Sequence, residues 1–180
     1  GIRDIGVTGV QTCALPICND YALDAAQKYP DRFAVMGRIL LNDPKAPAQL
    51  ANWKQQKGML GIRCTFNSAQ TSWLSNGTAD WLWPAAAKAG VPIMILVAGR
   101  QAEFAKIAAR NPDTIFILDH MALSNDDVKA GKLAQAVADT AALAKFPNVS
   151  CKMSSAPTRS LEEYPYNDMK PRSEEHSSEL

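Results

Sequence analysis

The stretch ARNPDTIFIL, residues 109–118, decides the fold. It joins the end of a helix-like segment, residues 100–110, to a short apolar run, residues 114–118. Arg110 suits the negative end of a helix, and Pro112 cannot continue one. The run that follows has the length and the composition of a buried strand. The stretch therefore predicts a helix that ends at a cation, followed at once by a strand.

The same junction recurs four more times along the chain. It is found as KYPDRFAVMG (28–37), KGMLGIRC (57–64), KAGVPIMILV (88–97) and AKFPNVSCKM (144–153). Helix-like segments with apolar residues three or four positions apart come before these junctions, at residues 22–28, 46–56, 78–89 and 126–145. Alternating strands and helices predict a parallel sheet with right-handed crossovers. We expect parallel strands, adjacent in chain order, near residues 33–40, 59–65, 91–97, 114–119 and 148–153.

Two α/β architectures fit this pattern, an open doubly wound sheet and an arc of a (β/α)₈ barrel. No glycine-rich loop of the dinucleotide or P-loop type follows any of the apolar runs. That weakens the nucleotide-binding, doubly wound alternative. In both architectures, the chemistry takes place at the carboxyl ends of the strands.

The two ends of the chain differ from the rest. Residues 1–17 and residues 172–180 have no helical or strand period that continues into their neighbours. DNA that encodes VQTCALPI of the head encodes RSEEHTSEL on its other strand, which differs from the tail only at Ser177. Both ends resemble translated sequencing adapter. We expect residues 1–17 and 172–180 to be non-native and residues 18–171 to be the native α/β domain.

Composition narrows the classes of function. The small positive net charge of residues 18–171 forms no basic block, so a nucleic-acid partner is not expected. No apolar run approaches the roughly 18 residues that span a membrane. Cys64 and Cys151 lie in apolar strand-like runs, the usual setting of inert buried thiols in a reducing compartment. These features predict a cytoplasmic domain, and they leave the oligomeric state open.

The strand ends supply the candidate site residues. His120 follows the run 114–118, where an imidazole can bind a metal, act as a base, or simply hydrogen-bond in a loop. Arg63 and Lys152 can hold a substrate carboxylate or can pair with an acid on a neighbouring strand. Side chains alternate along a strand, so we expect His120 to face the barrel interior and Asp119 the helix layer.

Three further strand-end residues have weaker support. Arg38 has the same two interpretations as Lys152. Ser154 and Ser155 have no base close to them in the sequence, so a serine nucleophile is not predicted.

Five of these segments together resemble the amidohydrolase-related group of TIM-barrel hydrolases, and most of all its dicarboxylate lactonase-like branch. The resemblance covers residues 19–170 and rests on YPDRFAVMGRILLNDP (29–44), GMLGIRCTFN (58–67), WPAAAKAGVPIMILV (83–97), NPDTIFILDHMAL (111–123) and FPNVSCKMSS (146–155). It implies strands three to seven of a barrel that hydrolyses an ester, lactone or amide of a small carboxylated substrate.

The resemblance also implies roles for single residues. His120 corresponds to the strand-six histidine that activates or positions water, Arg63 to a strand-four arginine that can meet a substrate carboxylate, and Lys152 lies on strand seven. The histidine pair of the family's first strand does not occur in this chain, and we expect the aspartate of the last strand to be missing as well. We therefore expect the chain by itself to be inactive.

Cofactor use and reaction type stay open at this point. The run VPIMILVAG, residues 91–99, has no histidine at its end, which favours a branch that can work without a bound metal. A zinc site needs about three protein ligands. We expect no metal in this chain, while the full-length parent can carry a divalent metal. The alternatives are a metal-dependent decarboxylase of the sister branch and a non-catalytic α/β module in which Arg63 and His120 are structural.

Overall fold

Five parallel strands form one sheet in the order β1-β2-β3-β4-β5. The computed structural model describes residues 19–66, 68–155, 157–160 and 162–167. The strands are β1 (Val35–Gly37), β2 (Met59–Thr65), β3 (Ile93–Leu96), β4 (Phe116–Leu118) and β5 (Val149–Cys151). This order confirms the predicted adjacency and argues against the doubly wound alternative, in which one strand lies between earlier neighbours. The expected non-native ends, residues 1–17 and 172–180, lie outside the described residues.

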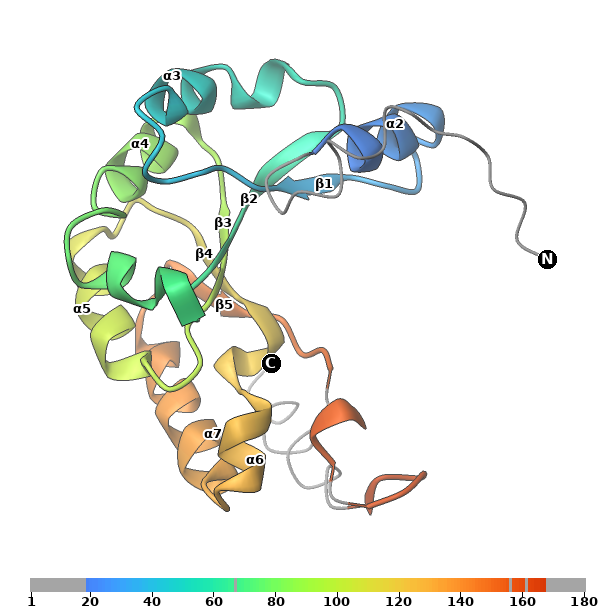
Figure 1. The fold of residues 1–180 in the computed structure, drawn as a ribbon, viewed down its shortest axis with the longest axis vertical. Helices are drawn as coiled ribbons and strands as arrows, with labels where there is room; N and C mark the ends of the chain where they lie inside the picture. The colour runs from blue at the N-terminus through green and yellow to red at the C-terminus, as the bar shows by residue number, and fades with distance from the viewer. Residues whose placement is uncertain (1–18, 67, 156, 161, 168–180) are drawn as a thin grey trace.

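Helices precede and connect the strands, and those between β1 and β4 lie together on one side of the sheet (Figure 1). The α-helices are α2 (Asp20–Lys28), α3 (Ala46–Ala51), α4 (Leu82–Ala89), α5 (Gln101–Arg110), α6 (Asn125–Lys129) and α7 (Leu133–Ala141). Short 3₁₀ segments are η1 (Trp53–Gln55), η2 (Ser68–Leu74), η3 (Asp119–Ala122), η4 (Ala142–Lys145) and η5 (Pro157–Arg159). The helix-like segment at residues 126–145 forms two α-helices, α6 and α7, followed by η4. Gly131 has a φ of +67°, and this left-handed residue separates α6 from α7.

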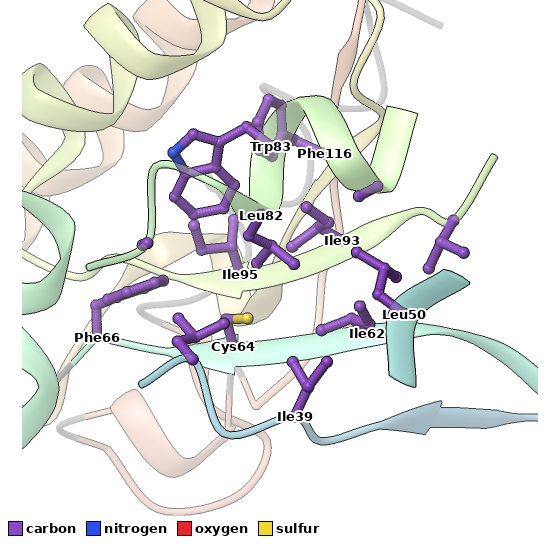
Figure 2. Close-up of a cluster of buried hydrophobic side chains, with 14 of the residues drawn as sticks. Ile39, Leu50, Ile62, Cys64, Phe66, Leu82, Trp83, Ile93, Ile95 and Phe116 are labelled. Atoms are coloured by element: carbon purple, nitrogen blue, oxygen red, sulfur yellow. The ribbon is translucent and has the colours of Figure 1, made fainter. Parts of the chain in front are cut away.

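The core lies between the sheet and the helices that cover it. Alternate strand residues point into it and meet side chains of α3 and α4, as Figure 2 shows for Ile39, Leu50, Ile62, Cys64, Phe66, Leu82, Trp83, Ile93, Ile95 and Phe116. The Phe116 ring packs edge-on against Phe104, with 5.1 Å between ring centroids, and against Trp83 at 5.8 Å. This layer fixes which face of each strand is left for chemistry.

The opposite face of the sheet carries the half-buried side chains. Arg63 of β2 lies beside Met94 of β3, and Met94 lies beside Ile117 of β4. All three are partly exposed, whereas their neighbours along each strand are buried under the helices. In a (β/α)₈ barrel this face is the interior, so we call it the inner face.

Cys64 and Cys151 differ in their burial, although the sequence predicts that both thiols are buried. Cys64 is buried, as expected, but Cys151 is exposed, so the expectation of a second buried thiol is wrong. Cys151 lies in β5, which pairs only with β4 among the described strands and has little cover. Within the described part of the chain, none of the helices has the length and apolar character to cross a membrane.

Candidate active site

Asp119 is the centre of a cluster formed by the ends of three strands. Its side chain is fully buried, with 0% exposed. Arg63 donates from Nε to Oδ2 of Asp119 at 2.8 Å and also donates from Nη2 to the same oxygen. Lys152, just after β5, donates from Nζ to Oδ1 at 2.9 Å. Both carboxylate oxygens therefore accept hydrogen bonds from cations that are far apart in the sequence.

The sequence leaves two interpretations open for Arg63 and Lys152: each can bind a substrate carboxylate or pair with an acid on a neighbouring strand. Both cations pair with an acid on another strand, because Asp119 follows β4. Their side chains are still 29% and 41% exposed. A guanidinium has five N–H groups and an ammonium three, so hydrogen atoms remain for a ligand on the exposed side. The ion pairs and a carboxylate-binding role are thus compatible.

The expectation that Asp119 faces the helix layer, on the opposite side from His120, is wrong. Phe116 and Leu118 are buried on the helix side, so alternation along β4 places Ile117 and Asp119 on the inner face. The strand ends at Leu118, and His120 has φ 55° and ψ 38°, a left-handed conformation to which strand alternation does not apply. The imidazole Nε2 lies 3.4 Å from Asp119 Oδ2. Both side chains therefore lie on the inner face.

His120 contacts two serine hydroxyls that the sequence-based reasoning missed. Its Nδ1 lies 2.8 Å from Ser154 Oγ and 2.9 Å from Ser155 Oγ, and its Nε2 lies 3.4 Å from Arg63 Nη2. The serines are 34 and 35 residues from the histidine, so no local pattern links them. The usable signal was strand order, because consecutive parallel strands place the residues after β4 and β5 side by side.

Opposing effects set the ionisation of Asp119. Burial by itself would raise the pKa of this carboxyl group. Hydrogen bonds from Lys152 and Arg63, together with the charge of Arg63 and of His120, outweigh that effect and hold the pKa below its ordinary value. Asp119 is therefore an anion at neutral pH and partly neutralises the two cations.

A further cationic side chain, that of Arg38, lines a cavity beside the cluster. Arg38 and Arg63 both line it, together with Gln70 and Thr65, whose buried hydroxyl has no partner among the described residues. Gly37 pairs with Ile62 in the sheet. The residues that follow them, Arg38 and Arg63, are therefore neighbours. Three cations thus accompany the one carboxylate of Asp119, and this part of the inner face has an excess of positive charge.

A second, more open pocket borders His120. Ser155 and Thr158 line it on the side of β5, and Asp126 lines it on the side of α6. Phe66, at the end of β2, lines both this pocket and the arginine-lined cavity.

The described residues do not fit a zinc ion. They contain no group of three His, Cys, Asp or Glu side chains placed to hold a metal, whereas a zinc site needs about three protein ligands. Both oxygens of Asp119 already accept hydrogen bonds from Arg63 and Lys152.

Comparisons with known proteins agree with this architecture. A family model described as an amidohydrolase matches residues 5–176. No curated protein matches the chain. An amidohydrolase from Burkholderia multivorans with bound zinc is 20% identical, with a TM-score of 0.66 over 83% of this chain and 57% of that one. An uncharacterised TIM-barrel protein from Bordetella bronchiseptica is 17% identical, with a TM-score of 0.60 over 83% of this chain and 50% of that one.

For a third similar structure, a probable enzymatic activity is named. It is a probable 2-pyrone-4,6-dicarboxylic acid hydrolase from Acinetobacter baumannii with citric acid bound. It is 17% identical, with a TM-score of 0.60 over 88% of this chain and 60% of that one. At these identities the likeness shows the fold, a TIM barrel. The chain spans little more than half the length of these structures.

Proposed function

The chain belongs to the amidohydrolase family, and from this premise we propose that it is the middle part of a (β/α)₈ hydrolase. In this proposal β1 to β5 stand for about strands three to seven, which agrees with their parallel order and with the share of each similar structure that the chain covers. Residues 18–171 are the barrel part, and residues 1–17 and 172–180 come from adapter DNA. Sequencing the source DNA through both junctions tests this assignment.

The proposed reaction is the attack of water on the carbonyl of an ester, lactone or amide in a small carboxylated substrate. Arg63 and Lys152 hold a substrate carboxylate. His120 takes a proton from water as the new carbon–oxygen bond forms, and that proton later reaches the leaving group. The observation that carries the proposal is the meeting of Arg63, His120 and Lys152 around Asp119 at the carboxyl ends of their strands.

Charge supports a substrate with more than one carboxylate. Arg38, Arg63 and Lys152 lie on the inner face near the single carboxylate of Asp119, so an anionic ligand would relieve their mutual repulsion. The Acinetobacter baumannii structure, which has the same fold, has citric acid bound. A lactone that carries two carboxylates, such as 2-pyrone-4,6-dicarboxylate, is therefore the first substrate to test.

The chain alone should be inactive and marginally stable. The inner face carries the half-buried side chains of Arg63, Met94 and Ile117, which the opposite wall of a complete barrel would cover. A site that lacks part of its residues loses orders of magnitude in rate. Sheet edges without partners also promote aggregation.

The experiment compares the chain with the longer gene product from the same source. We expect the longer protein to hydrolyse 2-pyrone-4,6-dicarboxylate faster than a neutral lactone, and the chain to show no turnover. In the longer protein, Arg63→Met should raise KM about tenfold or more, because a charged hydrogen bond to the substrate is lost. His120→Asn should lower kcat by about 100-fold or more. Arg110→Met is the matched control, since Arg110 is exposed at the end of α5 and outside the cluster.

Two other outcomes would support the alternatives. Release of carbon dioxide from a carboxylated substrate, without lactone opening, would support the decarboxylase. Absence of turnover by the longer protein on every substrate, with Arg63→Met and His120→Asn affecting only its stability, would support the non-catalytic module.

A further inference from the structure

Arg100, which immediately precedes α5, holds the connection between β2 and α4 at two points. Its Nη1 donates to the carbonyl oxygen of Thr71, and its Nη2 donates to Ser75 Oγ at 3.3 Å. Both acceptors belong to the stretch 68–75, which contains η2, and they lie on either side of Trp73. Among the described residues, only Arg100 makes hydrogen bonds that reach this stretch from outside residues 68–79. Arg100 therefore fixes the stretch to the start of α5.

The guanidinium of Arg100 is largely occupied by partners within the protein. Its Nε donates to Glu103 Oε2 at 2.6 Å, and its Nη2 forms an ion pair with the same oxygen. The side chain is only 20% exposed. A guanidinium has five N–H groups, and these contacts use most of them. Arg100 lines neither the arginine-lined cavity nor the pocket that borders His120. A role in substrate binding would therefore act through the stretch that Arg100 holds.

That stretch forms one wall of the arginine-lined cavity. Gln70 and Trp73 both line the cavity. Thr71 directly follows Gln70, so the hydrogen bond from Arg100 to the Thr71 carbonyl fixes the backbone beside this side chain. The buried hydroxyl of Thr65, which lines the same cavity, has no partner among the described residues. A buried hydroxyl without a partner costs free energy, so the cavity suits a ligand with polar atoms.

We propose that Arg100 is a positioning residue: by holding the stretch 68–75, it keeps Gln70 and Trp73 in the wall of the arginine-lined cavity and strengthens the binding of a carboxylate there. The polar side chains that line this cavity can all donate a hydrogen bond, and two of them are guanidinium groups. The inference rests on the proposed function, because the carboxylate would be one of the substrate's. Binding of a carboxylate can nevertheless be measured without turnover.

A purely structural role for Arg100 is the competing explanation. In that case Arg100→Met would lower the free energy of unfolding and would leave the affinity of the folded protein for a carboxylate unchanged. A positioning role predicts a weaker affinity and a higher KM in the folded protein. It also predicts little change in kcat, because His120 lines the other pocket.

The first measurement is amide hydrogen exchange on the full 180-residue chain. The amides of Ser75 and Asn76 both donate to Ser72 O, at 3.1 and 2.9 Å. We expect Arg100→Met to speed the exchange of these two amides about tenfold, with the amides of the strands unchanged. Arg110→Met is the matched control, because Arg110 is exposed at the other end of α5.

The second measurement is calorimetric titration of the longer protein with citrate. We expect Arg100→Met to weaken citrate binding about three- to tenfold, the range for one lost neutral hydrogen bond. Gln70→Ala should have a similar effect, and Arg100→Met should weaken binding less in the Gln70→Ala background than in the wild type, since Arg100 acts through Gln70. In the lactone assay, Arg100→Met should raise KM by the same factor and change kcat by less than about twofold.

Four results would overturn the proposal. They are unchanged exchange at Ser75 and Asn76, unchanged citrate affinity of Arg100→Met, full additivity with Gln70→Ala, and a wild-type longer protein that does not bind citrate. If Arg100→Met does not fold, Arg100→Lys takes its place, because it keeps the charge and loses the fork of donors. A longer protein that binds citrate but opens no lactone would remove the proposed reaction and leave the role of Arg100 in place.

Discussion

Arg63 and Asp119, 56 residues apart in the sequence, are joined by two hydrogen bonds to one carboxylate oxygen. The pair reaches across β3, because Arg63 lies in β2 and Asp119 follows β4. Lys152 holds the other carboxylate oxygen from the far side. Asp119 therefore ties three strand ends together, and it also keeps two cations close enough to His120 to serve one site.

Asp119→Asn should destabilise the chain by about 1.5–3 kcal/mol, because charged hydrogen bonds from Arg63 and Lys152 are lost at a fully buried position. Urea unfolding measures the free energy. Asp139→Asn is the matched control: Asp139 is exposed, and among the described residues it accepts a hydrogen bond from Gln135 on the same helix, so a change within about 0.5 kcal/mol is expected. Equal effects of the two substitutions would show that the cluster does not stabilise the sheet.

Phe116→Ala should be among the most damaging substitutions in the core. The side chain is fully buried and packs edge-on against Phe104 and Trp83, so its removal should cost about 3–5 kcal/mol. The preceding residue Ile115 is 55% exposed, and Ile115→Ala should change the free energy of unfolding by less than about 0.5 kcal/mol. Urea unfolding of both variants tests which face of β4 lies under the helices. A larger effect at Ile115 would reverse the assignment of the two faces.

The strands could be predicted from the sequence because their signals are local. In ARNPDTIFIL a cation, a proline and an apolar run follow one another directly, and β4 lies within that run. The turn that brings His120 to the same face as Asp119 could not be predicted, since no glycine marks the left-handed backbone at His120, Met121 and Ala122.

The contacts of the candidate site were harder to predict than its members. Arg63, His120 and Lys152 could be named from their places at strand ends. Strand alternation from an inward-facing His120 predicts the wrong face for their shared partner Asp119, because β4 ends at Leu118 and the alternation does not continue to His120. The choice of partner depends on side chains brought together by the sheet, and local patterns do not contain that information.

Cys64 and Cys151 should differ in reactivity. Burial raises the pKa of the Cys64 thiol to about 12, so only about one thiol in ten thousand is ionised at pH 8. Cys151 is exposed on β5. With iodoacetamide and peptide mass spectrometry, we expect Cys151 to be labelled in the folded chain and Cys64 at least about 100-fold more slowly. In urea the two rates should become similar, and equal rates in the folded chain would contradict the burial of Cys64.

The stability that Asp119 contributes should depend on pH with a definite sign. Its pKa in the folded chain lies below the ordinary value of 3.8, because hydrogen bonds from Lys152 and Arg63 outweigh the effect of burial. The unfolded chain therefore binds a proton at Asp119 more readily than the folded chain does. The difference in unfolding free energy between the wild type and Asp119→Asn should be fully present above about pH 5. It should shrink as the pH falls through the range below 3.8, because Asp119 then takes up a proton in the folded chain as well. Urea unfolding of both chains at a series of pH values measures this difference, and the other carboxyl groups cancel because both chains contain them. A difference that grew on acidification would mean that the folded chain binds the proton more tightly, which would contradict the ion pairs described for Asp119.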